Sequence, residues 1–339
     1  MLRLEARAQP SKLMSLLSPL LALVLTALLA AALFAAQGKD PARGLAIFFV
    51  EPWSNLRQVS ELLLKATPLI TIALGLAVCY RSDVWNIGAE GQFLLGVLAG
   101  GGVALWLTTQ GIVLPRALAL PLVLAGAVLG GMAWAALTAL LRDRFNASEI
   151  LVSLMLVYVA QQLVNYMVFG PWKDPAGFNF PQTKNFDAST WLPNLLPGTR
   201  LHIGLAIALA LAALVWVFLF RLFRGYQLQV GGLAPAAARY AGFSARSSLW
   251  TALLISGALA GLAGGMEAIG SFRQIMPHVS TGLGFTAIIV CFVGRLHPVG
   301  IAFAGLLLST MIIGGELGQS RLGLPNALSG VFQGLLLVL

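Results

Sequence analysis

Long apolar runs separated by short polar segments make up most of the chain. An apolar run of about 20 residues crosses the hydrocarbon core of a bilayer as a helix, because a helix satisfies its own backbone hydrogen bonds where lipid offers no partner. We therefore predict an all-α polytopic membrane protein that forms a single transmembrane domain over residues 1–339. Ten runs are candidate spans, of which two are short: 13–36, 62–80, 91–107, 118–141, 149–169, 201–220, 249–270, 283–294, 298–314 and 327–339. The last run ends at Leu339 without the charged or aromatic anchor that usually marks a membrane surface, so we expect the native chain to continue beyond it.

The stretch DVWNIGAEGQFLL, at residues 83–95, interrupts the apolar pattern between the second and third runs. It combines four polar side chains with two glycines, which indicates irregular backbone whose polar groups face protein or water rather than lipid. A similar order of apolar run, polar and glycine break, and Gly/Ala-rich run returns at residues 285–309. Interrupted spans in corresponding places of two halves are typical of transporters whose substrate passes between repeats, so we expect a weak two-half internal repeat.

Charged residues are sparse and unevenly placed. Only 10% of the residues are charged and 58% are hydrophobic, whereas soluble domains average about 25% charged residues. The net charge of +9 does not indicate nucleic-acid binding, because the basic residues stand mostly singly between apolar runs. Basic clusters at 142–144 and 221–224 contrast with the segment 170–200, which has three basic residues and is rich in proline and aromatic residues. The bias of Lys and Arg toward the cytoplasm therefore predicts a cytoplasmic amino terminus in a bacterial inner membrane, with the loop 170–200 outside.

Catalytic motifs are missing from the sequence. The nucleotide-binding pattern G-x-x-x-x-G-K-[ST] requires a hydroxyl residue after Gly-Lys, and Gly38-Lys39 is followed by Asp40. The metalloprotease pattern H-E-x-x-H, a paired Cys-x-x-Cys and the serine-hydrolase elbow G-x-S-x-G are also missing. We therefore expect no enzymatic activity, no metal site and no cofactor in this chain.

Among the polar side chains within or next to predicted spans, five are candidates for a functional role: Glu90, Gln161, Gln162, Asn165 and Glu267. A polar or ionisable side chain is costly at membrane depth, so it usually faces a cavity or hydrogen-bonds to another helix. Each of the five therefore lines a substrate path or joins two helices, and the residue pattern leaves both interpretations open.

The segment 221–248 is too polar to span a membrane and begins with a basic cluster. Within it, PAAARYAG places Pro235 where a short helix begins and Gly242 where it ends. Such a helix has a small-residue face and a projecting Tyr240, which suits docking in a groove of another protein. A simple connector between two spans is the equal alternative.

Four motifs carry a resemblance to a known family: DVWNIGAEGQ at 83–92, NASEILVSLML at 146–156, PAAARYAG at 235–242 and GFTAIIVCFVGRLHPVG at 284–300. In this order they resemble the permease subunits of ABC importers for simple sugars and nucleosides, a family related to the ribose and branched-chain amino acid permeases. The resemblance covers the chain from about residue 62 to its end.

This resemblance implies a transmembrane subunit that forms half of the translocation path of an ATP-driven importer for a nucleoside or simple sugar. Its implied partners are a second homologous permease, cytoplasmic ATPase subunits that hold ATP and Mg²⁺, and an external solute-binding lipoprotein that docks on residues 170–200. The coupling helix that contacts the ATPase would comprise Pro235, Ala237, Arg239, Tyr240, Ala241 and Gly242. The translocation path or gate would include Asn86, Glu90, Gln92, Gln161, Asn165, Glu267 and Phe285.

A second functional class also fits a polytopic protein with buried carboxylates. In an ion- or proton-coupled secondary transporter of a small polar solute, Glu90 or Glu267 would carry the proton. The two classes differ in their requirements, because the importer needs separate ATPase subunits and the secondary transporter works alone.

Overall fold

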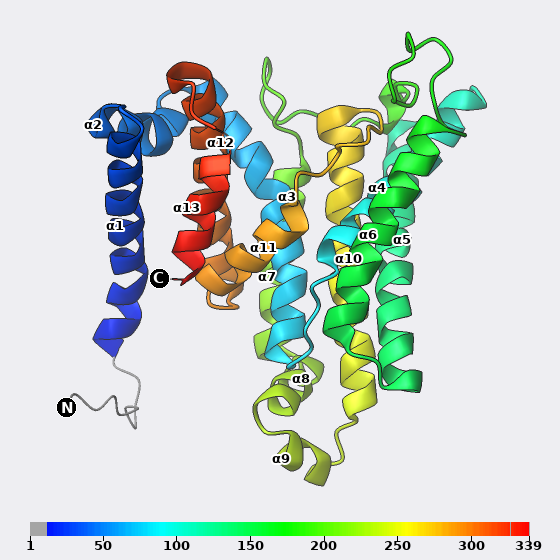
Figure 1. Cartoon of the computed structure of the whole chain (residues 1–339). Helices are drawn as coiled ribbons and strands as arrows, with labels where there is room; N and C mark the ends of the chain where they lie inside the picture. The colour runs from blue at the N-terminus through cyan, green and yellow to red at the C-terminus, as the bar shows by residue number, and fades with distance from the viewer. Residues whose placement is uncertain (1–11, 326, 339) are drawn as a thin grey trace, which may run out of the picture. The chain divides into compact units, whose positions relative to one another are not determined.

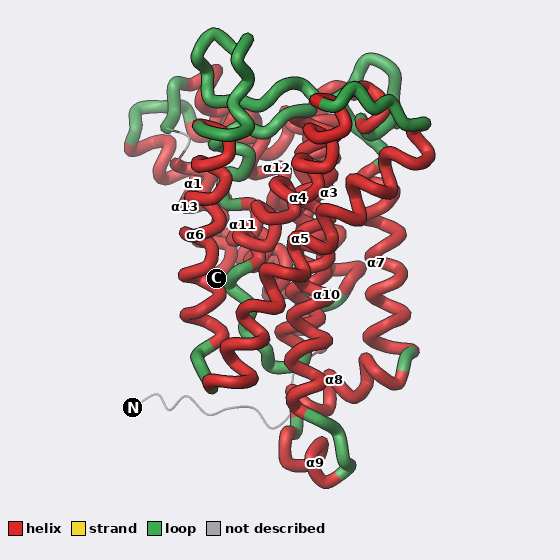
Figure 2. Tube along the Cα trace, turned by 90° about the vertical axis from the view of Figure 1, so that its right-hand side faces the viewer, coloured by secondary structure: helices red, strands yellow, loops and turns green. Residues whose placement is uncertain are grey.

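The computed structural model describes residues 12–325 and 327–338, which fold into helices joined by loops (Figures 1 and 2). Two compact units are present: the smaller comprises Met1–Gln58 and Thr310–Leu339, and the larger comprises Val59–Ser309. The expected continuation of the chain past Leu339 concerns a position outside the described residues. The single transmembrane domain over residues 1–339 stays a prediction.

Seven helices in the described residues are long and apolar enough to cross a membrane. They are α3 (Leu56–Arg81), α4 (Ala89–Thr109), α5 (Arg116–Phe145), α6 (Glu149–Phe169), α7 (Gly204–Arg221), α10 (Ala245–Met266) with its π-helical extension η4 (Glu267–Phe272), and α12 (Pro298–Leu322). Shorter apolar helices occupy the remaining predicted runs: Leu21–Ala36, Leu283–Val293 and Ala327–Val338. The prediction of an all-α polytopic protein with some short spans is therefore confirmed.

The smaller unit is built around a cluster of phenylalanine rings. It contains α1 (Lys12–Ala36), α2 (Pro41–Leu45), η1 (Ala46–Val50), η2 (Glu51–Trp53) and α13 (Ala327–Val338). The ring of Phe48 lies 5.5 Å from that of Phe34 and 5.2 Å from that of Phe332, measured between centroids. All three side chains are fully buried, so these contacts join α1, η1 and α13.

Small residues bring three helices of the larger unit close together. Helix α10 packs against both α4 and α5. A Cβ atom on Gly261 of α10 would collide with backbone atoms of Ala127 and Gly131 in α5, and one on Gly96 of α4 would collide with Gly261. Because lipid gives no hydrophobic drive for helices to associate, such close backbone contact is a main source of packing energy. The glycine spacing in SGALAGLAGG thus marks the centre of this unit.

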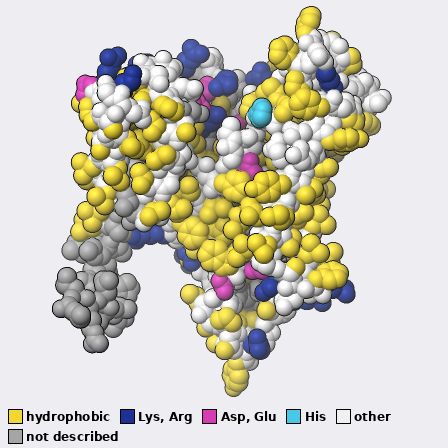
Figure 3. Space-filling view, in the orientation of Figure 1, with side chains coloured by type: hydrophobic (Ala, Val, Ile, Leu, Met, Phe, Trp, Pro, Cys, Tyr) yellow, Lys and Arg dark blue, Asp and Glu magenta, His cyan; other side chains and the backbone are white. Residues whose placement is uncertain are grey.

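Connecting segments gather at two opposite ends of the larger unit (Figures 1 and 2). One end, here called the α9 end, carries α8 (Phe223–Leu233) and α9 (Pro235–Tyr240). The other, the η3 end, carries the long loop around η3 (Ala188–Thr190). Between the ends, the visible surface of this unit is mainly hydrophobic (Figure 3), as expected for a lipid-facing surface.

Candidate functional site

The polar stretch between the second and third runs divides into an irregular segment inside the larger unit and, from Ala89 onward, the first turns of α4. Residues 82–88, the first break, lie between α3 and α4. The Tyr80 hydroxyl donates to the carbonyl oxygen of Asn86 over 3.1 Å, and the Ile87 amide donates to the Ser153 hydroxyl over 3.2 Å. Side chains from neighbouring helices thus replace the hydrogen bonds that a helix would provide, which is the condition for irregular backbone at membrane depth.

Asn86 and Gln92 form a closed hydrogen-bond network around this break. The Asn86 amide donates to Gln92 Oε1 and to the Ser256 hydroxyl, both over 2.9 Å. Its oxygen accepts from the Gly88 amide over 3.0 Å and from Gln92 Nε2 over 3.1 Å. The side chains of Asn86 and Gln92 are at most 1% exposed and hydrogen-bond to one another and to Ser256. Their assignment to the translocation path or gate stays a prediction.

A second break follows α10. The helix first widens into the π-helical turn η4, and residues 273–282, the second break, then leave helical geometry before α11 (Leu283–Val293) begins. Arg273 and Gly282 bound the break with φ of 60° and 89°. A π-helical turn is often found at functional sites, and here it ends a predicted span.

Three elements hold the second break in place. The Glu90 carboxylate of α4 accepts from the Gly284 amide over 2.6 Å, and Gln161 Nε2 of α6 donates to the Pro277 carbonyl over 3.1 Å. In the loop at the η3 end, the Thr183 amide donates to the carbonyl of Ile275 over 3.1 Å. Glu90 and Gln161, both predicted from sequence, are thereby brought to one segment.

Glu90 caps the amino terminus of α11. Its side chain is buried, with 5% exposure, and besides Gly284 it interacts with the Ser280 hydroxyl and the Gly282 amide. The first amides of a helix lack intrahelical partners and carry partial positive charge, so a carboxylate there satisfies both the hydrogen bonds and the charge. Glu90 is therefore a positioning residue for α11 and the second break.

The second break also exposes side chains. His278 and Thr281 are exposed, and Phe285 in the first turn of α11 is 39% exposed. Because unwound backbone at membrane depth must face protein or a water-filled cavity, these side chains are candidates for contact with a polar solute. Sequence reasoning selected Phe285 and missed His278 and Thr281. The signal was the polar run RQIMPHVSTG, which separates a long predicted span from a short one.

Polar side chains of α6 lie beside this break. Gln161 and Asn165 are half-buried, Gln162 is exposed, and the three are joined by hydrogen bonds of 3.2–3.4 Å. Through its bond to Pro277, Gln161 connects this α6 group to the second break. The structure thus forms a continuous polar surface from α6 to the second break.

Glu267 lies in η4, one turn before the second break, and is 7% exposed. Its charged neighbours are Lys65 of α3 and Arg200 near the η3 end, and Arg200 also pairs with Glu61 over 2.9 Å. These cations offset the burial of a carboxylate. Glu267 is therefore placed with a charge cluster rather than with Glu90 at α11.

His202 packs against the same π-helical turn from the η3 end. Its Nδ1 accepts the Gly204 amide over 3.1 Å, just before α7 begins, and its ring lies against Gly270. Burial, together with the positive charge of Arg273, lowers the pKa of His202 to about 4. The imidazole is therefore neutral at pH 7 and supports η4 as an uncharged group.

The short helix α9 has the boundaries expected from its sequence. Pro235 begins it, and Gly242, with φ of 77°, follows its end. The Phe243 amide donates to the Ala238 carbonyl over 2.9 Å, which closes the carboxyl end. Ala238 is buried whereas Tyr240 is 97% exposed, so α9 packs on its small-residue side and projects the tyrosine.

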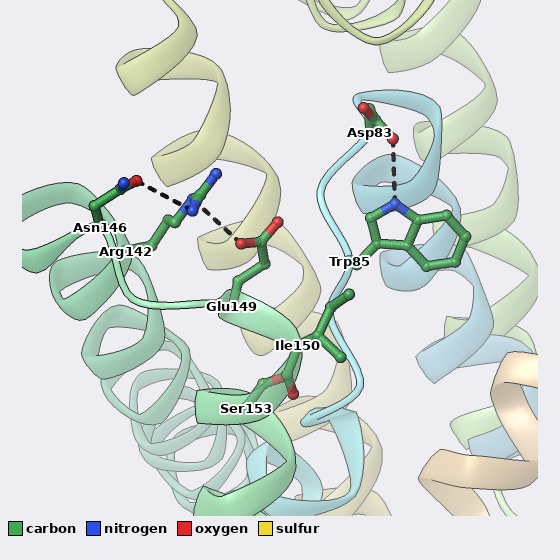
Figure 4. A network of polar contacts seen from close by, with 7 residues as sticks. All are labelled: Asp83, Trp85, Arg142, Asn146, Glu149, Ile150 and Ser153. Carbon is green, nitrogen blue, oxygen red and sulfur yellow. Dashed lines mark hydrogen bonds and ion pairs between the residues drawn. The ribbon is translucent and has the colours of Figure 1, made fainter.

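A cavity of about 440 Å³ lies beside α9 and is lined by charged residues that join the helix ends there. Arg142 pairs with Glu149 and with Asn146, each over 3.2 Å, which fixes the turn between α5 and α6 (Figure 4). Asp83 accepts from the indole of Trp85 over 3.2 Å in the neighbouring first break (Figure 4). The ends of α3, α5 and α6 thus form a base beside α9.

Metal ligation finds no support in the part of the chain that the structure describes. Over residues 12–325 and 327–338, no three His, Cys, Asp or Glu side chains lie close enough together to hold a metal ion. Cys79 and Cys291, at the ends of α3 and α11, are buried free thiols.

Comparison with known proteins shows the family. Residues 58–339 match the family model described as the permease component of branched-chain amino acid transport systems. The chain is 34% identical to a glucose ABC transporter permease protein of Haloferax volcanii, over 88% of this chain and 80% of that protein. It is 32% identical to a guanosine ABC transporter permease protein of Bacillus subtilis, over 93% of this chain and 90% of that protein. The chain therefore belongs to the permease family of the branched-chain amino acid transport type, whose relatives here are multi-pass permeases of ABC transporters.

Proposed function

We propose that this chain pairs with a second permease and forms half of the translocation path of an ATP-driven importer for a nucleoside or simple sugar. Permease components of ABC transporters are not themselves enzymes, and membership in this family implies ATPase and solute-binding partners. The ATPase subunits hold ATP and Mg²⁺, and the solute-binding protein docks on residues 170–200. In this proposal the α9 end faces the cytoplasm, and the bias of Lys and Arg places the amino terminus inside as well.

The exposed second break is the observation that carries this proposal. Its backbone is held by Glu90 and Gln161, while His278 and Phe285 remain accessible. Imidazole and an aromatic ring suit a solute that has both hydrogen-bonding groups and a flat face, as a nucleoside has. We therefore favour a nucleoside over a sugar, although the relatives include permeases named for glucose and for guanosine.

One continuous element joins α9 to the second break. Helix α10 begins at Ala245, a few residues after Tyr240, and runs without interruption into η4, which leads directly to the break. Closure of the ATPase subunits on ATP displaces α9, and α10 transmits this displacement to η4. Since packed helices move as rigid bodies, the second break changes its accessibility as the path alternates between the two sides of the membrane.

Transport by the reconstituted complex tests this function. The chain is co-expressed with candidate second-permease and ATPase subunits from the same organism, placed in liposomes, and supplied with the binding protein and labelled guanosine or glucose. We expect uptake that requires ATP and the binding protein, with guanosine preferred. Uptake by the purified chain alone, driven by a proton gradient, would show the secondary transporter instead.

The assignment of α9 is tested separately by Tyr240→Asp. We expect the ATPase subunits to be lost from the purified complex while the chain still inserts in the membrane, because a charged group replaces the projecting ring. Tyr226→Asp on α8, where the ring is 57% exposed, is the matched control and should retain the ATPase. Full ATPase retention by Tyr240→Asp would remove α9 from the interface.

A further inference from the structure

A second cavity, of about 460 Å³, opens at the η3 end of the larger unit. One wall is the last part of α4, where Gly102, Leu105 and Trp106 lie on the same side of the helix. The other wall is the loop after α6, with Trp172 and Lys173, and Lys184 from farther along the loop. None of the residues used by α9 or the second break lines this cavity.

The cavity carries uncompensated positive charge. Lys173 and Lys184 line it, and no acidic residue does. Lys173 Nζ donates to Asn179 Oδ1 over 2.5 Å, a neutral acceptor, and in the part of the chain that the structure describes neither lysine forms an ion pair. The carboxylate of Asp174, next to Lys173 in the chain, does not line the cavity and accepts the Ala176 amide over 3.0 Å. The lysines therefore remain available to an anion.

The backbone at each lysine is hydrogen-bonded to a neighbouring element. The Lys173 amide donates to the Gly170 carbonyl at the end of α6 over 3.2 Å. Lys184 follows Thr183, whose amide is bonded to the Ile275 carbonyl of the second break. Hydrogen bonds therefore fix the backbone at both lysines, which do not stand on a free loop.

Aromatic walls give the cavity the character of a membrane interface. Trp106 is 54% exposed, and the ring of Trp172 rests where Gly102 leaves room: a Cβ there would lie 2.8 Å from Trp172 Cη2. Tryptophan at the end of a span is typical of the lipid headgroup level. Phe169 and Tyr166, in the last turns of α6, are 59% and 65% exposed, so exposed aromatic rings continue from this end over the last turns of α6.

We propose that this cavity binds the phosphate headgroup of an anionic phospholipid. Lys173 and Lys184 contact the phosphate, Trp106 and Trp172 pack on the glycerol region, and the first part of the acyl chains covers Tyr166 and Phe169 at the end of α6. A lysine ammonium forms a charge-assisted hydrogen bond with a phosphate oxygen. An acidic side chain of a protein partner would match the lysines but would leave the exposed rings of Tyr166 and Phe169 uncovered, which is why a lipid is the better occupant.

Short-chain lipids test this site on the full chain, assembled with its partner subunits in neutral detergent. Dihexanoyl phosphatidylglycerol, dihexanoyl phosphatidylcholine and inorganic phosphate are titrated separately while tryptophan fluorescence is recorded. We expect phosphatidylglycerol to bind at least tenfold more tightly than phosphatidylcholine. Lys184→Gln should weaken phosphatidylglycerol binding about fivefold, since one lysine at a membrane surface contributes an effect of that order. Arg116→Gln, which removes one charge at the same end outside the cavity, should leave it unchanged.

Two variants keep the result interpretable. Trp172→Phe should abolish most of the fluorescence response, which locates the signal in this cavity, and Gly102→Ala should weaken binding of both lipids by displacing the ring. Equal affinity for the two lipids, or phosphate binding as tight as that of phosphatidylglycerol, would overturn the lipid assignment. Loss of solute-binding-protein docking in Lys184→Gln, with lipid affinity unchanged, would overturn it in favour of a protein partner.

Discussion

The two breaks in the larger unit solve the same physical problem in different ways. In the first break, residues 82–88, the side chains of Asn86, Gln92 and Ser256 satisfy one another and are sealed from the surface. In the second break, residues 273–282, the backbone is satisfied by groups from other elements, and side chains of the break itself remain exposed. The comparison separates polar residues that hold a membrane protein together from those available to a solute.

The difference follows from where each break finds its hydrogen-bond partners. Asn86 uses its own side-chain amide to replace helical hydrogen bonds, so none of its polar atoms is left for a ligand. The second break instead receives Glu90 and Gln161 from α4 and α6, which leaves His278 free to face outward. An unsatisfied buried polar group costs about 1–3 kcal/mol, so both arrangements protect the backbone. They differ in what they expose: the first break exposes Asp83 and Trp85, and the second exposes His278 and Thr281.

The largest effect is expected from Glu90→Ala. This substitution removes the hydrogen bond between the Glu90 carboxylate and the start of α11, here called the clamp on the second break. The amides at the start of α11 then lose their acceptor in a buried site, which costs about 3 kcal/mol and displaces the break. We expect ATP-dependent uptake to fall about 100-fold, as measured in proteoliposomes at equal amounts of folded complex. Glu90→Gln should retain most activity because its amide oxygen still accepts from Gly284.

Glu61→Ala is the matched control for the clamp. Glu61 pairs with Arg200 in a partly exposed position, and such pairs contribute about 1 kcal/mol or less. Its uptake should stay within about fivefold of the wild type. Wild-type uptake by Glu90→Ala would show that the clamp is dispensable and that the break is positioned by other contacts.

Asn86→Ala should break the closed network without touching the solute surface. It leaves the partners Gln92 and Ser256 buried and unsatisfied, so the free energy of unfolding should fall by about 2–3 kcal/mol. Denaturant titration in detergent measures this loss, and the KM for solute should not change. Asn194→Ala, at an exposed site, controls for the substitution and should cost less than about 1 kcal/mol. A raised KM in Asn86→Ala would return Asn86 to the translocation path.

Acidification should weaken the support of the second break through His202. The folded protein lowers the pKa of His202 to about 4, from an ordinary value of 6.5, so between these pH values the unfolded chain binds a proton that the folded chain excludes. Stability is therefore full above about pH 6.5 and falls as the pH decreases. From pH 7 to pH 5 the loss should be about 2 kcal/mol, measured by denaturant titration at each pH.

His202→Gln identifies the group responsible and should flatten this dependence. Asp187, whose pKa is lowered by hydrogen bonds from Ser189, acts in another range, because its contribution is lost only as the pH falls below about 4. A slope between pH 7 and pH 5 that persists in His202→Gln would assign the effect to another residue.

The apolar runs and their breaks could be predicted from the sequence, because hydropathy reflects the cost of leaving backbone unsatisfied in lipid. The expected similarity between the segments after the second run and after Cys291 has a local counterpart at the ends of α3 and α11: the Val84 amide donates to the Cys79 carbonyl, and the Leu296 amide donates to the Cys291 carbonyl. The rings of Tyr80 and Phe292, next to the two cysteines, stack at 5.0 Å. A shared local sequence thus gives a shared helix end.

The roles of the polar residues could not be predicted, because they depend on distant partners. Asn86 and Glu90 stand four residues apart, yet their partners Ser256 and Gly284 lie 170 and 194 positions away along the chain. The sequence shows that burying each polar side chain is costly. It does not show which distant residue forms the hydrogen bond that offsets this cost. His278 was missed for a related reason, since it falls between predicted spans and only packing shows that its segment is clamped beside α6.

The smallest of these effects, and the sharpest for the comparison, is expected from His278→Ala. The side chain is exposed and its loss should change the free energy of unfolding by less than about 0.5 kcal/mol. If the imidazole contacts the solute, the KM for uptake should rise about tenfold, equivalent to about 1.4 kcal/mol, with the maximal rate little changed. His297→Ala is the control, because His297 lies after α11 and its Nδ1 accepts the Val299 amide over 3.3 Å. A KM unchanged by His278→Ala would mean that the second break, like the first, serves only to hold the helices together.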